Sequence, residues 1–158
     1  MTHCDLRQNE YANTAAAAPP ENSMFALDPI LDRDSAEICA LPLCRVRLMR
    51  DARYPWLILV PARENVVEIG DLAREDRVAL MDAIVLASRA IDELYEPGKM
   101  NVAAIGNIVR QLHVHIVGRN AGDPAWPGPV WGHSAAVPYT DDALSETIED
   151  IRAILGSE

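Results

Sequence analysis

The chain has 158 residues, of which 49% are hydrophobic and 24% are charged, and its formal net charge at pH 7 is −10. Such fractions are typical of an ordinary globular protein with one domain. The acidic balance argues against a general nucleic-acid binder, which carries a basic surface. It leaves anionic small molecules open, because a local group of donors can reverse the field inside a cleft.

The two parts expected along the chain are a tail over residues 1–23 and a single domain over residues 24–158. Residues 15–20 read AAAAPP and have no periodic apolar face that could enter a core. The first residues lack the pattern of a signal peptide, and no segment approaches the ~20 apolar residues of a membrane span. The three cysteines do not have the spacing of metal ligands, and an odd number cannot all pair in disulfides. We therefore expect a cytoplasmic protein with reduced thiols and with neither a membrane nor a nucleic acid as partner.

The first elements are expected soon after Phe25. Residues 37–41 form a short apolar segment that ends at Pro42. Alternating side chains over residues 43–49 predict a strand, and the apolar run 56–61 predicts a buried strand that a proline ends. Because a turn-like segment connects these two strands, we expect them to form an antiparallel hairpin.

A long amphipathic helix is the clearest element of the second half. Apolar residues recur at helical spacing over residues 74–95, and acidic residues occupy the first turn. Strands are expected at 100–105 and 111–118, followed by a loop rich in proline and glycine over 123–138. Thr140 is a candidate N-cap for a final short helix. Strands on both sides of one long helix favour an α+β fold with an antiparallel sheet.

The candidate catalytic and binding residues lie in the expected strand that includes residues 111–117, which read QLHVHIV. In a strand, alternate side chains share a face at a spacing of ~7 Å, so Gln111, His113 and His115 would project together. Two structural histidines on a sheet face are one interpretation. A metal-binding pair is another, although no acidic or cysteine residue lies at an obvious ligand spacing.

Phosphate chemistry is the third interpretation. A neutral imidazole is a good nucleophile, and a second imidazole can be cationic near its ordinary pKa of ~6.5 and donate to a phosphoryl oxygen. Gln111 can donate through its amide but cannot carry a proton charge. Gly106 and Asn107 lie just upstream and could offer a backbone N–H and an amide to the same phosphate.

The same segment resembles the signature of the histidine triad (HIT) superfamily, His-φ-His-φ-His-φ-φ with φ apolar, except that Gln111 stands at the first position. The resemblance extends from about residue 25 to residue 131, and it includes the segments 54–61, 72–95 and 101–107. Residues 123–132 read DPAWPGPVWG and are similar to a bacterial branch of diadenosine tetraphosphate hydrolase-like proteins. The resemblance implies an antiparallel sheet of about five strands with one long helix and a short C-terminal helix.

The resemblance also implies a homodimer whose two sheets join, and a nucleotide hydrolase or nucleotidyl transferase. Its substrate would be a dinucleoside polyphosphate or a related nucleoside phosphate, cleaved at a phosphoanhydride or phosphoramidate bond. The catalytic residues expected are His113, which would form a covalent nucleotidyl intermediate, together with His115 and Gln111. The residues expected to bind nucleotide or phosphate are Asn101, Asn107, Gly106, Asp51 and Arg53. No cofactor is required and no metal site is expected, although Mg²⁺ could accompany the nucleotide.

Gln111 leaves an alternative open. Since an amide cannot protonate a leaving group, the chain could instead be a non-catalytic or weakly catalytic nucleotide-binding protein. Among the aromatic residues, Trp56 is expected in the core, whereas Trp126 and Trp131 could stack on a base or attach a loop to the body of the protein. His133 is expected at the surface.

Overall fold

The computed structural model describes residues 25–156, so the tail expected over residues 1–23 lies outside the described residues. Five strands form one antiparallel sheet in the order β1-β2-β3-β5-β4. The strands are β1 (Ser35–Ala40), β2 (Cys44–Met49), β3 (Trp56–Pro61), β4 (Lys99–Ala104) and β5 (Val114–Arg119). The helices are α1 (Pro29–Asp34), a single 3₁₀ turn (Ile69–Asp71), α2 (Arg74–Tyr95) and α3 (Asp141–Leu155). The α+β class with one antiparallel sheet and one long helix is confirmed.

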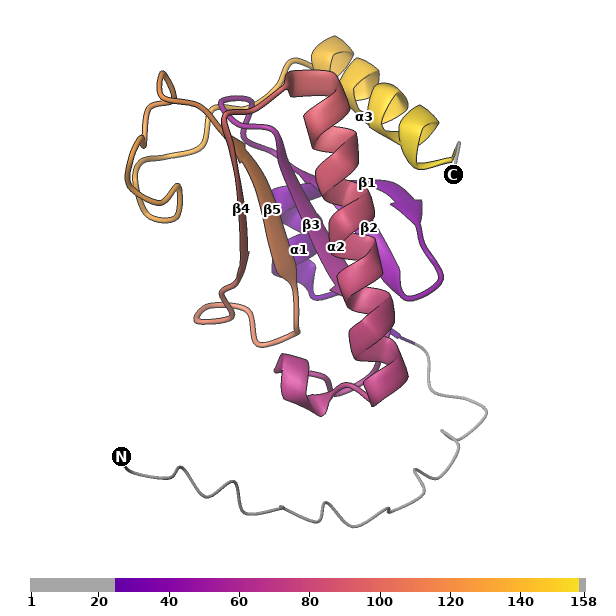
Figure 1. Ribbon diagram of the computed structural model, residues 1–158. Helices are drawn as coiled ribbons and strands as arrows, with labels where there is room; N and C mark the ends of the chain where they lie inside the picture. The colour runs from indigo at the N-terminus through magenta and orange to yellow at the C-terminus, as the bar shows by residue number, and fades with distance from the viewer. Residues whose placement is uncertain (1–24, 157–158) are drawn as a thin grey trace, which may run out of the picture.

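The sheet separates two apolar clusters. Helix α2 lies across one face, and α1 lies behind the opposite face (Figure 1). On the α2 face, alternate residues of the central strands, among them Val46, Leu57 and Ile116, pack under the helix and against α3. On the α1 face, Ile58 and Val117 belong to a second cluster that includes Leu31. The two-residue periodicity of β-strands therefore assigns β3 and β5 side chains alternately to the two faces.

The expected hairpin is confirmed, because β2 and β3 pair antiparallel with Val46 opposite Leu59. After β3, the chain crosses the sheet through α2, returns along the edge as β4, and then enters the sheet between β3 and β4 as β5 (Figure 1). This order places the end of the β4–β5 connection beside the middle of β3. His115 on β5 consequently lies opposite Ile58 on β3 and opposite Ala103 on β4.

Several element boundaries differ from those expected. The last strand begins at Val114 rather than at residue 111, so Gln111 and His113 precede the regular ladder. Strand β4 lies one residue earlier than expected. Helix α1 was not predicted at all, because it is only six residues long and has no room for an apolar periodicity. Helix α3 begins after the expected N-cap, Thr140, but has fifteen residues rather than being short.

One glycine permits the close packing of α2 on β5. A Cβ atom added at Gly118 would lie 2.9 Å from Cγ2 of Ile91, and 3.3 Å from Cβ atoms of Pro55 and of Pro97. Since Ile91 is buried in the core and the two prolines have restricted backbones, a larger residue would push the helix away from the sheet. The glycine after the motif therefore serves the packing of α2.

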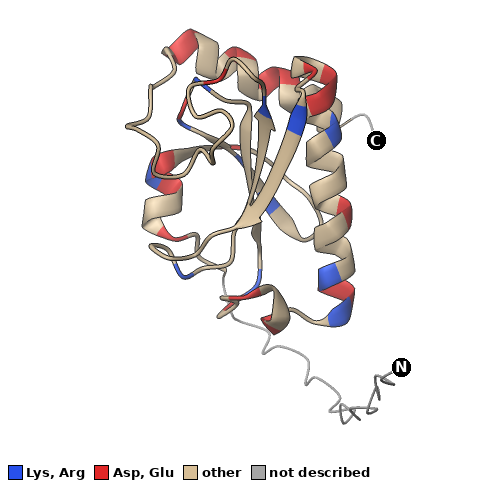
Figure 2. Cartoon of the chain, turned by 60° about the vertical axis from the view of Figure 1, so that its left-hand side comes forward, with Lys and Arg blue, Asp and Glu red and all other residues tan. Residues whose placement is uncertain are grey.

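The charged residues of the described part of the chain form no single basic face. Figure 2 shows Lys and Arg scattered over several elements, while acidic positions are spread over the helices and loops. No helix in the described part of the chain is both long enough and apolar enough to cross a membrane.

Candidate functional site

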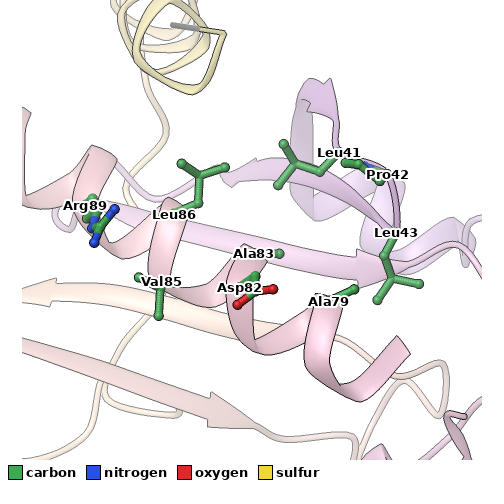
Figure 3. A pocket seen from close by; sticks show the side chains of 9 residues that line it. All are labelled: Leu41, Pro42, Leu43, Ala79, Asp82, Ala83, Val85, Leu86 and Arg89. Carbon is green, nitrogen blue, oxygen red and sulfur yellow. The ribbon is translucent and has the colours of Figure 1, made fainter. Parts of the chain in front are cut away.

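Two sizeable hollows lie on opposite sides of the sheet. The first, of about 510 Å³, is a groove between α2 and the β1–β2 connection, and its lining is mostly aliphatic (Figure 3). Asp82 and Arg89 are its only charged lining residues, and it contains no histidine. The groove therefore holds none of the expected site residues.

The second hollow is a cleft of about 460 Å³ on the α1 face, and it contains both histidines of the motif. This volume lies within the range of small-molecule sites. Its wall is formed by α1, by β3, by the β4–β5 connection and by the loop after β5. Its lining residues are mostly apolar, including Ile30, Leu31, Met49, Ile58, Ile105, Ile108, Val109 and Val130, with Trp56 and Trp131 as aromatic members.

His113 is held in one tautomer by the backbone. Its Nδ1 lies 2.7 Å from the carbonyl oxygen of Gln111. Because a carbonyl oxygen only accepts hydrogen bonds, Nδ1 carries the proton and donates. The lone pair of the neutral ring is then on Nε2. His113 is 5% exposed and lines the cleft, so the residue expected to attack has the tautomer that a nucleophilic Nε2 requires.

His115 is held in the complementary tautomer by Trp56. The indole Nε1 of Trp56 donates to Nδ1 of His115 at 3.0 Å, so the neutral ring carries its proton on Nε2. Burial first, and the neighbouring His113 second, lower the pKa of His115 to about 3. This corrects the expectation of a cationic neighbour, because at neutral pH His115 offers a neutral N–H.

Two indole rings pack against the imidazole pair. The His113 and His115 centroids are 4.9 Å apart, and the His115 centroid is 5.5 Å from the centroids of Trp56 and of Trp131. Trp131 lies on the loop after β5, and its indole N–H is buried without an acceptor among the described residues. Of the two tryptophans that could stack on a base or attach a loop, Trp131 therefore lines the cleft beside His115, and its indole N–H has no acceptor among the described residues. The other, Trp126, is 43% exposed and lies beside the Arg119 guanidinium.

Gln111 does not share the face of the two histidines as expected, because regular strand geometry begins only at Val114. Its side chain lies outside the cleft lining. Its Nε2 donates to the carbonyl of Ala26 at 2.8 Å, and its Oε1 accepts from the N–H of Asp28 at 2.9 Å. The amide is thus bound to the segment before α1, and it is the backbone carbonyl of Gln111 that contacts His113.

Asp51 and Arg53 bind each other and a loop. Asp51 is 3% exposed, and its carboxylate accepts from Nε of Arg53 at 2.8 Å and from Nη2 of Arg53 at 2.6 Å. The same carboxylate accepts from the N–H of Val137, while Arg53 donates to Oγ of Ser134. Burial acts to raise the pKa of Asp51, but the hydrogen bonds from Arg53 and from backbone N–H groups outweigh it, so that pKa is lowered. Asp51 lines the cleft, and its hydrogen bonds to Arg53 and Val137 fix the loop over the cleft.

The three remaining expected residues lie in three different places. Asn107 lines the cleft, and Gly106 lines a small cavity on the other side of His113. Asn101 does not reach the cleft, because its Oδ1 accepts from Nη1 of Arg119 at 2.9 Å. Arg119 is 1% exposed and also bonds Asp123, so Asn101 belongs to the polar cluster that supports the loop after β5.

A metal centre has no third ligand here. Within residues 25–156, no group of three or more His, Cys, Asp or Glu side chains is placed to hold a metal ion. Nδ1 of His113 and Nδ1 of His115 are both engaged with protein atoms.

Two features of the site were not predicted from the sequence. The first is the α1 wall, for which the one local signal was Asp28-Pro29, a cap residue followed by proline at a helix start. The second is the polar partner of Trp56, a residue expected only as part of the core. Because Trp56 has the same alternation parity as Ile58, which lies opposite His115, the face of Trp56 could have been inferred once β3 and β5 were paired.

Comparisons with known proteins agree with this geometry. Residues 32–122 match the HIT domain family. A histidine triad protein of Bradyrhizobium japonicum is 41% identical, with a TM-score of 0.82, over 84% of this chain and 99% of its own. A histidine triad protein of Sinorhizobium meliloti 1021 is 43% identical, with a TM-score of 0.80, over 82% and 96%. A third, from Marinobacter aquaeolei VT8, is 41% identical, with a TM-score of 0.83, over 85% and 98%. No curated protein matches the chain.

Proposed function

This chain belongs to the HIT domain family, and from that premise we propose that it is a nucleotide hydrolase or nucleotidyl transferase that acts through a covalent nucleotidyl-His113 intermediate. The observation that carries the proposal is the tautomer of His113, because the Gln111 carbonyl leaves its Nε2 with a lone pair in a cleft of suitable size. Family membership supports nucleotide binding and this general class of activity.

The proposed reaction has two displacements at phosphorus. Nε2 of His113 attacks the α-phosphorus of a nucleoside phosphate, a P–N bond to His113 forms, and the bond from phosphorus to the leaving group breaks. The N–H on Nε2 of His115 and the unpaired indole N–H of Trp131 are donors suited to phosphoryl oxygens, whose negative charge grows during attack. Water or another acceptor then displaces His113 and releases the nucleotide. The leaving group takes its proton from solvent, since Gln111 cannot supply one.

The apolar side of the cleft suits a nucleoside. Aliphatic residues of α1 and of the β4–β5 connection form a slot for a planar base, and the imidazoles lie at its polar end. We propose a single nucleoside phosphate as the bound portion of the substrate, with dinucleoside polyphosphates, phosphoramidates and related adenylyl compounds as the classes to test. Mg²⁺ would enter only with a polyphosphate. The free thiols of Cys39 and Cys44 are in keeping with a cytoplasmic location.

We also propose a homodimer. Three exposed apolar residues, Val78, Met81 and Val85, lie on one face of α2 at 51%, 59% and 44% exposure. Strand β4 is an edge strand, and its Val102 is 46% exposed. A free edge together with an exposed apolar stripe is the kind of surface that a second copy covers in a symmetric dimer.

A nucleotide-binding protein without turnover is the second candidate, and the occupied amide of Gln111 favours it. The test is a panel of dinucleoside polyphosphates and nucleoside phosphoramidates, assayed with wild type, His113→Ala and the exposed-histidine control His133→Ala. We expect nucleoside monophosphate from wild type and the control, and no product from His113→Ala. Equal activity in His113→Ala would contradict the proposed intermediate, whereas nucleotide binding with no product from wild type would favour the second candidate.

A further inference from the structure

Gln111 contacts both His113 and the segment before α1. Its backbone carbonyl accepts from Nδ1 of His113, and its side-chain amide accepts from the N–H of Asp28 and donates to the carbonyl of Ala26. The partners of the side chain lie 83 and 85 positions away in the sequence. An amide can both donate and accept in this arrangement, whereas a carboxylate has no donor. The side chain therefore joins the chain before α1 to the backbone that orients His113.

The joined segment leads directly into the α1 wall of the cleft. Asp28 is the N-cap of α1, and its Oδ1 accepts from the N–H of Ile30 at 2.8 Å. Ile30 and Leu31 then line the cleft. A helix of six residues cannot hold its own position, because isolated helices of this length are unstable in water. Its place therefore depends on what holds its ends.

The C-terminal end of α1 has a separate anchor in the sheet. Arg47 on β2 is 3% exposed, and it donates to Oγ of Ser35 at 2.7 Å and to Oδ1 of Asp32 at 2.7 Å. Arg47 fixes α1 relative to β2, and Gln111 fixes the other end relative to the segment that carries His113. Gln111 is therefore the connection between the nucleoside wall and the nucleophile.

We infer that Gln111 is a positioning residue, which fixes the position of the α1 wall of the nucleoside cleft relative to His113. This inference rests on the proposed function, because it takes the cleft as the nucleotide site. The residue then governs how well the nucleotide binds and leaves the protonation of the reacting groups unchanged.

The first experiment compares Gln111→Leu, Gln111→Asn and Gln111→His with wild type. We expect the KM of a nucleoside phosphoramidate and the Kd of AMP to rise about tenfold in Gln111→Leu, as two hydrogen bonds are lost. The value of kcat and its pH profile stay within about twofold of wild type, since the bonds to His113 and His115 remain. Gln111→His weakens AMP binding and does not raise kcat. A raised kcat in Gln111→His, or a lowered kcat with unchanged KM in Gln111→Leu, would overturn the inference.

A matched pair at Asp28 isolates the backbone bond. Asp28→Ala removes only the capping carboxylate, whereas Asp28→Pro also removes the N–H that donates to Gln111. Proline is compatible with the φ of −58° at this position. We expect AMP to bind more weakly to Asp28→Pro than to Asp28→Ala, and this difference to disappear in a Gln111→Leu background. A difference of the same size in both backgrounds would show that the bond does not position the wall.

Amide hydrogen exchange separates failure of this inference from failure of the proposed function. In Gln111→Leu we expect faster exchange over residues 30–34 and unchanged exchange in β2 and β3, with or without nucleotide. If wild type neither binds AMP nor turns over substrate, the proposed function fails, and the exchange result still decides whether Gln111 holds the wall. Unchanged exchange over residues 30–34 would overturn the inference even in an active enzyme.

Discussion

Trp56 and His115 stand on the paired strands β3 and β5, and the indole of Trp56 donates to the imidazole of His115 at 3.0 Å. The bond satisfies a buried donor and a buried acceptor together. It also determines which ring nitrogen of His115 carries the proton at the cleft.

Replacing Trp56 with phenylalanine tests this relationship. The variant keeps an aromatic ring but leaves Nδ1 of His115 buried without a donor, which costs about 1–3 kcal/mol of unfolding free energy. The proton can then move between the two ring nitrogens, so we expect kcat to fall on the order of tenfold to a hundredfold. Nitrogen chemical shifts of the imidazole would report the tautomer directly. Trp126→Phe, at an exposed tryptophan, is the control. Chemical shifts and kcat in Trp56→Phe equal to those of wild type would refute the assigned tautomer of His115.

The burial of His115 predicts a specific acid sensitivity. The pKa of His115 is lowered to about 3 in the folded protein, against an ordinary 6.5, first by burial and then by His113. Between these values the unfolded chain binds a proton that the folded chain does not, so stability falls as the pH drops below 6.5. In His115→Asn we expect a shallower loss between pH 6.5 and pH 4.5, by at most about 1.4 kcal/mol per pH unit. Chemical denaturation across this range measures the free energy of unfolding of each protein. Carboxyl groups whose pKa is lowered, such as that of Asp51, contribute equally to both proteins. Parallel curves for the two proteins would contradict a neutral, buried His115.

The local patterns of this sequence were enough to predict most of the sheet and α2. The strand at 56–61 and the helix at 74–95 agree with β3 and α2, because both contain long apolar patterns that only one geometry can bury. The start of β5 was wrong by three residues. Alternation cannot distinguish a paired strand from an extended segment whose backbone bonds another partner, as it does where the N–H of Leu112 donates to the carbonyl of Val66.

The site was predicted less completely than the fold. Both histidines lie in the cleft as expected, because the alternating motif and the resemblance pointed to the same residues. Gln111 was expected at the nucleotide from the motif, Asn101 from the resemblance and Asp51 from its place before the helix, and in the structure each of them has a protein partner. Those partners, Asp28, Val137 and Arg119, lie from 18 to 86 positions away, and single-sequence reasoning has no signal for such pairs.

Asp51→Asn is expected to loosen the loop that covers the cleft. The carboxylate binds Arg53 and the N–H of Val137, and its side chain is 4% exposed. Breaking a buried pair costs about 3–5 kcal/mol, and since the Arg53 side chain is 17% exposed we expect the lower part of that range or less. Residues 131–138 should become the first site of limited proteolysis. Asp141→Asn, an exposed acidic residue at the start of α3, is the control, and equal cleavage of both variants would argue against this role for Asp51.

The proposed homodimer predicts a strong effect of charge on α2. Met81→Glu places a carboxylate in the exposed apolar stripe, where two copies would bring like charges together and bury them. We expect the mass in solution, measured by light scattering, to change from that of a dimer to that of a monomer. Val137→Glu is the matched control, because Val137 is also apolar and 47% exposed but lies on the loop after β5, where its backbone bonds Ala52 and Asp51. A monomeric wild type, or a dimeric Met81→Glu, would contradict the interface.

The charges of the cleft predict a preference among nucleotide substrates. Among residues 25–156, its one lining Lys or Arg is Arg33, which already donates to Asp34 at 2.6 Å and at 2.8 Å, and the cleft also contains Asp51. A polyphosphate with several negative charges therefore finds no unpaired cation among the described lining residues, whereas a phosphoramidate carries about one charge. We expect kcat/KM for adenosine 5′-phosphoramidate to exceed that for diadenosine tetraphosphate at least tenfold, a difference of about 1.4 kcal/mol.

The variant Asp34→Asn decides whether charge is the cause of this preference. Freed from Asp34, Arg33 can turn toward the phosphates, so we expect KM for the tetraphosphate to fall several-fold and the phosphoramidate to change little. Since Arg33 is 70% exposed, the gain should shrink as ionic strength rises from about 0.05 to 0.5 M, because salt screens exposed charges. Asp141→Asn removes the same charge far from the cleft and should leave both substrates unaffected. If the wild-type preference is reversed, or if Asp34→Asn improves both substrates equally, shape rather than charge selects the substrate.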